Sequence, residues 1–87
     1  MTIHLDIITP EGTVVCQDVD RVELPGSKGR FVVLKDHAPI VSSLVEGVIE
    51  YGEMPGSAGH DEKGSVQIRS GFVEVIDNHV TACVELK

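Results

Sequence analysis

Short apolar runs dominate this sequence, and none of them is longer than four residues. They are rich in Val, Ile and Leu, and Gly, Pro, Asn and Asp separate them. β-branched residues favour strands, and short strands between turn signals are typical of an all-β sandwich or barrel. A membrane-spanning helix needs roughly 20 apolar residues, so we expect no such segment. The pattern therefore predicts an all-β fold.

Length and charge narrow the class of protein further. The chain has 87 residues with nine Gly, four Pro and 3% aromatic residues, which predicts one domain, residues 1–87, around an aliphatic core. A formal net charge of −7 argues against a nucleic-acid-binding surface. The N-terminus shows neither of the common targeting patterns.

Alternating and turn-forming residues locate the expected strands. The segment 40–49 also fits one face of a helix, but its β-branched content and Gly47 favour two strands broken at Glu46-Gly47. Asp77-Asn78 predicts a tight hairpin turn, and residues 53–64 predict a mobile hairpin loop. The other expected strands are Thr2–Thr9, Thr13–Cys16, Val19–Leu24, Phe31–Leu34, Ser65–Ser70, Gly71–Ile76 and His79–Leu86.

The segment 24–39 is the most distinctive part of the chain. Pro25-Gly26 has the residue order of a type II turn, with Gly26 at φ > 0, and a second break is expected at Lys35-Asp36. Three of the seven basic residues lie between positions 26 and 35, without an acidic residue. Either a solubilised turn or a cationic contact patch explains this charge, and we favour a docking surface.

Little in the sequence indicates catalysis. Cys16 and Cys83 lie in apolar runs, which predicts reduced thiols in the core. Four histidines are present, but no nucleophile–base pair or zinc-ligand spacing accompanies them. His60 is expected to have a loose polar role in its loop. We therefore expect no catalytic residue, no metal and no cofactor.

A lipoyl- or biotinyl-type carrier domain is the main alternative among small acidic all-β proteins. Such domains carry a modified Lys at a tight hairpin tip between two similar halves. Lys63 lies in a long predicted loop, Lys35 is followed by Asp36-His37, and the two halves show no similarity. A mass shift on one Lys would revive this alternative.

Two colinear motifs resemble the ε subunit of the F-type ATP synthase. The first is Leu24-Pro25-Gly26-x-x-Gly29-x-Phe31-x-Val33-Leu34-x-x-His37-Ala38-Pro39. The second is Ser70-Gly71-Phe72-Val73-Glu74-Val75-x-Asp77-Asn78-x-Val80-Thr81. The opening residues, Ile3-His4-Leu5-Asp6-Ile7-Ile8-Thr9-Pro10, also fit the start of that family.

The resemblance implies a non-catalytic rotor subunit that couples proton flow to ATP synthesis. Its fold would be a β-sandwich of about ten short strands in two sheets. Its partners would be the γ subunit and the polar loops of the membrane c-ring, within the rest of the complex, on the cytoplasmic side of the bacterial plasma membrane. The partner-binding residues carried over are Ser27, Lys28, Gly29 and Arg30 toward the ring and His37, Ala38 and Pro39 at the γ and ring contact.

Three departures from the family pattern modify these expectations. Relatives commonly have Gly and Pro-Gly where this chain has Val32 and Lys35-Asp36, and some carry an acid at the position of Arg30. The usual carboxy-terminal helical hairpin is not seen after the second motif. Inhibition by that hairpin is therefore not expected.

Most apolar residues of the two motifs, including Leu34 and Phe72, are expected in the core.

Overall fold

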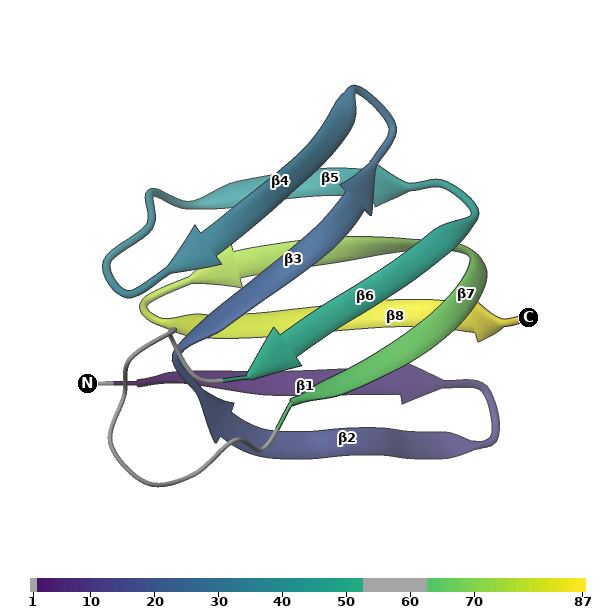
Figure 1. The fold of residues 1–87 in the computed structure, drawn as a ribbon, viewed down its shortest axis with the longest axis horizontal. Coiled ribbons are helices and arrows are strands. Elements are labelled where there is room, and N and C mark those ends of the chain that lie inside the picture. Colours follow the sequence, from purple (N-terminus) through teal and green to yellow (C-terminus); the bar gives the residue numbers. More distant parts are fainter. Residues whose placement is uncertain (1, 53–62) are drawn as a thin grey trace.

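Side-chain burial alternates along the strands. In the first strand, Ile3, Leu5 and Ile7 are buried, and the intervening His4 and Asp6 are half-exposed. The computed structural model describes residues 2–52 and 63–87, and these residues form eight strands and no helix (Figure 1). The strands are β1 (Ile3–Thr9), β2 (Gly12–Val19), β3 (Arg21–Gly26), β4 (Gly29–Leu34), β5 (Ile40–Leu44), β6 (Gly47–Gly52), β7 (Gly64–Ile76) and β8 (His79–Leu86).

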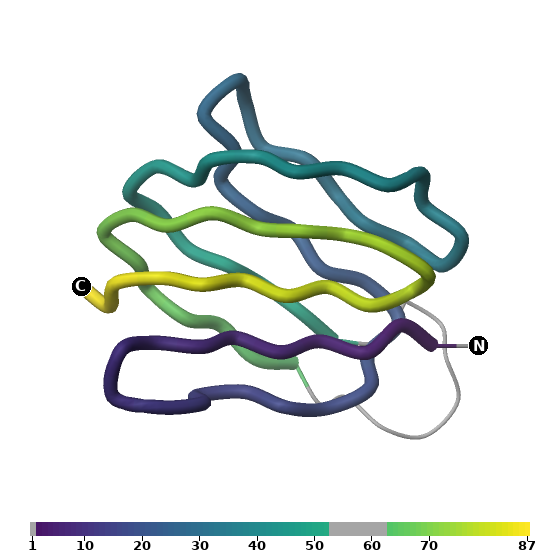
Figure 2. Tube along the Cα trace, turned by 180° about the vertical axis from the view of Figure 1, so that it is seen from behind, coloured from purple at the N-terminus to yellow at the C-terminus, as the bar shows by residue number. Residues whose placement is uncertain are grey.

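The strands form two packed layers, which confirms the predicted all-β sandwich (Figures 1 and 2). Layer 1 contains β2, β1, β8, the second half of β7 and β5, and layer 2 contains β4, β3, β6 and the first half of β7. Among the strands of the described residues, only β1 and β8 pair in parallel. β4 lies at the edge of layer 2, and β5 meets β3 at the single pair Gly26–Leu44.

Strand β7 belongs to both layers because it bends in the middle. Residues 64–68 pair with β6 and residues 71–75 pair with β5, while its register with β8 shifts between Ile68 and Ser70. The sequence predicted two strands here, and the structure joins them into one of 13 residues. The described residues thus contain eight strands, fewer than the expected ten or so.

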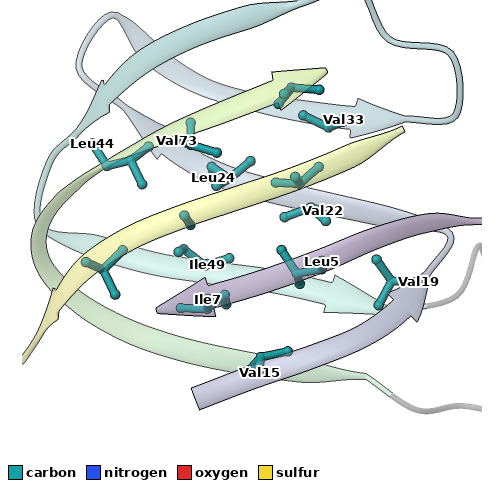
Figure 3. Close-up of a cluster of buried hydrophobic side chains, with 14 of the residues drawn as sticks. Leu5, Ile7, Val15, Val19, Val22, Leu24, Val33, Leu44, Ile49 and Val73 are labelled. Carbon is teal, nitrogen blue, oxygen red and sulfur yellow. The ribbon is translucent and has the colours of Figure 1, made fainter. Parts of the chain in front are cut away.

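The core between the layers is aliphatic, as the composition predicted (Figure 3). No polar or charged side chain among the described residues is buried. The buried residues are Ile3, Leu5, Ile7, Val15, Val19, Val22, Leu24, Val33, Leu44, Ile49, Ile68, Val73, Val75, Val80, Ala82 and Val84.

The turns confirm one prediction and correct another. Asp77 and Asn78 have φ values of 48° and 62°, as a tight two-residue hairpin turn requires. The predicted type II turn at Pro25-Gly26 is wrong, because both residues belong to β3 and the turn is Ser27-Lys28, followed by Gly29 at φ 123°. Gly26 is needed for space instead: a Cβ there would lie 2.8 Å from the Gly29 carbonyl oxygen.

Burial of the two cysteines differs from the prediction. Both thiols are free, but Cys16 is exposed and Cys83 is half-buried, because the side chains of both point outward from layer 1.

The predictions for His60 and for most of the loop 53–64 lie outside the described residues. Within residues 2–52 and 63–87, no helix has the length and apolarity to cross a membrane.

Candidate functional site

The β3–β4 hairpin presents the first group of predicted contact residues at its tip. The Ser27 backbone N–H donates to the Ser43 carbonyl at 3.0 Å, and the Ser43 hydroxyl donates to the Ser27 hydroxyl at 2.9 Å. These bonds fix the turn against the end of β5. Lys28 is exposed at the tip and makes no ion pair with the residues that the structure describes. The tip therefore offers one exposed cation on a backbone held by hydrogen bonds.

Arg30 is held against the protein surface. Its Nη2 donates to the Glu23 carboxylate at 3.2 Å and to the Val48 carbonyl at 2.9 Å. Cross-strand geometry explains the pairing, because outward-facing Arg30 lies diagonal to Glu23 on the outer face of layer 2. Glu23 thus neutralises much of the charge that the sequence assigned to a contact patch.

A groove of about 470 Å³ begins at this hairpin and runs along β5. β3 pairs along its length with β4 but meets β5 only at Gly26–Leu44, and β4 and β5 do not pair with each other. The lining includes all four predicted residues of the hairpin and the apolar side chains of Phe31, Ile40 and Val41. Residues lining the groove are Ser27, Lys28, Gly29, Arg30, Phe31, Ile40, Val41, Ser42 and Ser43.

The second group of predicted contact residues lies in the β4–β5 loop. His37 braces this loop, since its backbone N–H donates to the Leu34 carbonyl at 3.1 Å and its Nδ1 donates to the Ala38 carbonyl at 2.7 Å. Ala38 and Pro39 are exposed. His37 therefore holds the loop in shape through its backbone N–H and its Nδ1.

Asp36 ties the same loop to the β7–β8 turn. Its N–H donates to the Asn78 side-chain oxygen at 2.6 Å, and Asn78 Nδ2 donates back to its carboxylate at 3.2 Å. Asp36 has φ 65°, which confirms the predicted break. The bond from Asn78 and the Lys35 ammonium 3.3 Å away lower the pKa of the Asp36 carboxyl below its ordinary value.

The structure separates the two groups of predicted residues. They lie at opposite ends of the six-residue strand β4, roughly 20 Å apart at about 3.3 Å per residue (Figure 1). Lys28 and Lys35 therefore do not form one patch, and Lys35 pairs with Asp36. The predicted contact residues thus form two separate groups, and the groove extends from the first group to Ile40, next to the second.

An apolar patch on layer 1 was missed by the sequence interpretation. Val41, Phe72 and Ile76 are 72%, 54% and 48% exposed. Val41 lies opposite Glu74, so Phe72 and Ile76 are its diagonal neighbours on the same outer face. Phe72 was expected in the core, but it alternates with buried Val73, and this period-two signal around Glu74 could have revealed the patch.

Leu34 was likewise expected in the core and is 42% exposed. Within the predicted buried strand Phe31–Leu34, only Val33 is buried, because strand alternation turns Val32 and Leu34 outward. The site as a whole offers hydroxyls, one exposed ammonium, an imidazole and apolar surface, which suits binding.

Comparison with known proteins identifies the family. Residues 2–86 match the sequence model described as "ATP synthase, Delta/Epsilon chain, beta-sandwich domain". The chain is 43% identical over 84 residues to the ATP synthase epsilon chain of Campylobacter fetus and 44% identical over 84 residues to that of Nitratiruptor. These alignments cover 97% of this chain and 61% of each relative, so the chain spans about three fifths of their length.

Solved structures show the same fold. A cryo-EM structure of the Euglena gracilis mitochondrial ATP synthase, OSCP/F1/c-ring, contains a chain that matches with a TM-score of 0.81 at 24% identity, over 95% of this chain and 50% of that one. The central stalk/c-ring structure of the Tetrahymena thermophila mitochondrial enzyme contains another, with a TM-score of 0.76 at 16% identity, over 98% of this chain and 64% of that one. This chain belongs to the family of ATP synthase delta/epsilon-chain β-sandwich domains.

Proposed function

We propose that this protein is a non-catalytic central-stalk subunit of an F-type proton-translocating ATP synthase. It docks the γ subunit onto the membrane c-ring and so couples proton flow to ATP synthesis. The observation that carries this proposal is the family match over residues 2–86, together with 43% identity to a protein named ATP synthase epsilon chain. The same match favours this function over a lipoyl or biotinyl carrier.

The hairpin end of the site is the proposed contact with the c-ring. Ser27, Lys28 and Gly29 form an exposed polar tip, and polar loops of a membrane ring are a chemically matched partner. The bonds from β5 to Ser27 hold the tip in one shape, which lowers the entropy lost on binding. Arg30 supports the tip by joining β4 to β6 and contributes charge at its base.

The opposite end of β4 and the apolar patch form the proposed contact with γ. His37, Ala38 and Pro39 lead directly into β5, which carries Val41. Val41, Phe72 and Ile76 give this contact apolar surface, and exposed Glu74 lies among them, opposite Val41. Aromatic and aliphatic side chains beside polar groups are typical of protein interfaces. The two contacts lie far enough apart for both partners to bind together.

Residues 1–87 act as one β-sandwich domain in this proposal, without a cofactor or a reaction of their own. The protein would be peripheral, held by the complex on the cytoplasmic side of a bacterial plasma membrane. Bacterial relatives such as those of Campylobacter fetus and Nitratiruptor support that location.

Calorimetry with the cognate γ subunit at two salt concentrations tests the proposal. We expect one-to-one binding that persists at high salt, because three of the side chains in the proposed contact, Val41, Phe72 and Ile76, are apolar. Val41→Asp should weaken γ binding by about 10- to 100-fold, since burying a Val side chain is worth about 1.5–3 kcal/mol. Val14→Asp is the matched control, because Val14 is 44% exposed on the far edge strand β2. Absence of γ binding, or equal losses in the two variants, would contradict the assignment.

The ring contact has a separate test. Lys28→Glu should weaken association with c-ring-containing membranes and reduce coupled proton pumping, and the loss should shrink as salt rises. Lys63→Glu makes the same charge change at an exposed position outside the proposed contacts. Arg30→Glu is a less direct probe, because it also breaks the bonds to Glu23 and Val48. Unchanged association and pumping in Lys28→Glu would refute the hairpin contact.

A further inference from the structure

A cluster of His, Asp and Cys side chains lies on the outer face of layer 1, beside the apolar patch, since His79 at its border pairs with Ile76 of the patch. Cross-strand register assembles it: His4 faces Asp18 of β2 and His79 of β8, and Asp6 faces Cys16 of β2. Burial of Ile3, Leu5 and Ile7 directs His4 and Asp6 outward. Residues far apart in the sequence thus converge on three neighbouring strands.

Three potential ligand atoms in this cluster face one another. His4 Nε2 lies 3.3 Å from Asp6 Oδ1 and 3.6 Å from Cys16 Sγ, and the three residues offer ligand atoms that all lie within 4.8 Å of one another. With Zn–N of about 2.05 Å, Zn–O of about 2.0 Å and Zn–S of about 2.3 Å, a tetrahedral ion separates N from O by roughly 3.3 Å and N from S by roughly 3.6 Å. Both observed distances from His4 Nε2 match this geometry.

The hydrogen bonds around the cluster prepare His4 as a ligand. His4 Nδ1 lies 2.9 Å from Asp18 Oδ1, and because a carboxylate only accepts, Nδ1 carries the proton. In the neutral ring, Nε2 then presents a lone pair toward Asp6 Oδ1, which is also an acceptor. Two acceptors at this distance need a cation between them. A proton or a metal ion can fill that position.

The outer contacts of Asp6 complete the arrangement. His79 Nε2 donates to the other Asp6 oxygen, Oδ2, at 2.7 Å, which leaves Oδ1 for an ion. The His79 ring also packs edge-on against His4, with ring centres 5.0 Å apart. Ligands in metal sites are usually oriented by such outer carboxylate and imidazole partners.

We propose that His4 Nε2, Asp6 Oδ1 and Cys16 Sγ bind a divalent transition-metal ion of the zinc class, with Asp18 and His79 orienting the ligands. Mixed N, S and O donors in tetrahedral geometry suit Zn²⁺, and water would occupy the fourth position. On binding, the ion displaces the proton held between His4 Nε2 and Asp6 Oδ1, and the Cys16 thiol loses its own proton and ligates as thiolate; both protons go to solvent. Cys16 is exposed, so an ion can reach the site from solution. This proposal depends on neither γ nor the ring.

Titration of the isolated 87-residue chain with Co²⁺ tests the site, because Co²⁺ replaces Zn²⁺ in tetrahedral sites and is coloured. We expect saturable one-to-one binding with a thiolate-to-cobalt charge-transfer band, and Zn²⁺ should displace the Co²⁺. Cys16→Ser should abolish the band. Cys83→Ser is the matched control and should retain it, since Cys83 is the other free thiol of the same layer. Both substituted side chains lie outside the core, so a denaturation curve should show each variant folded.

A second variant distinguishes a preorganised metal site from nonspecific binding of Co²⁺ to an exposed thiol. Asp18→Asn should keep the charge-transfer band but weaken Co²⁺ binding by about 10- to 100-fold, because Asp18 only orients His4. Three results would overturn the proposal: no saturable binding by the folded chain, loss of the band in Cys83→Ser, or unchanged affinity in Asp18→Asn.

Discussion

Gly71→Ala tests whether close strand packing explains a glycine in the second sequence motif. Gly71 lies at the bend of β7, opposite Val84 of β8. A Cβ at this position would lie 2.5 Å from the Cys83 carbonyl oxygen and 2.9 Å from Val84 Cγ1. Because β8 is paired on both sides, by β7 and β1, that carbonyl cannot retreat without disturbing two ladders.

The expected magnitude follows from two opposing effects. Overpacking of a well-packed site costs about 1–3 kcal/mol, and replacing Gly by Ala recovers about 0.4–1 kcal/mol by restricting the unfolded chain. The net loss in unfolding free energy should be about 1–2 kcal/mol. For a domain of this size, that lowers Tm by about 5–15 °C. Urea and thermal denaturation of the purified variant measure both quantities.

Gly64→Ala, in the same strand, is the matched control. Its added Cβ would meet the end of the Tyr51 side chain, which is partly buried against the core and must shift, whereas in Gly71→Ala strand backbone must shift. We expect a smaller loss of unfolding free energy than in Gly71→Ala, because a side chain moves at less cost than a paired strand. Equal losses in the two variants would mean that any glycine in β7 is costly to replace. A Gly71→Ala variant as stable as the parent would refute the packing argument.

Three further changes probe the core, the hairpin turn and an ion pair. Leu5→Ala should lower the unfolding free energy by about 2–5 kcal/mol in urea titrations, because Leu5 is fully buried. Asn78→Ala should cost about 1–3 kcal/mol through the strained positive φ, whereas Asn78→Gly should restore most of that loss but not the bonds to Asp36. The lowered pKa of Asp36 implies stability that is present above its ordinary pKa of 3.8 and lost as pH falls toward the lower folded-state pKa. Acid titration of Asp36→Asn should show a weaker decline in that range, and an unchanged curve would contradict it.

Local stereochemistry made part of the fold predictable from sequence. Alternation in residues 3–9 and the pair Asp77-Asn78 predicted a strand and a tight turn that the structure confirms. The break of 40–49 into two strands is also confirmed, with β5 ending at Leu44 and β6 beginning at Gly47. These features depend on a residue and its close neighbours, so the order of residues suffices to indicate them.

The site was only partly predictable, because its properties depend on contacts between distant residues. Lys28, Arg30 and Lys35 lie in one basic segment of the sequence. In the structure, strand β4 separates Lys35 from Lys28, and Glu23 pairs with Arg30. Gly26 was assigned a turn because Pro-Gly favours one locally, whereas the approach of Phe31 and Gly29 requires the glycine for space.

The amino-acid order by itself determined the all-β class, the aliphatic core and the family, since these follow from local periodicity and colinear motifs. For several strands, only the tertiary structure decided which side faces outward. Phe72 is part of an exposed patch, and Cys16 lies outside the core, beside His4 and Asp6. A strand has two faces of equal intrinsic preference, and burial is assigned only when another layer packs on one of them.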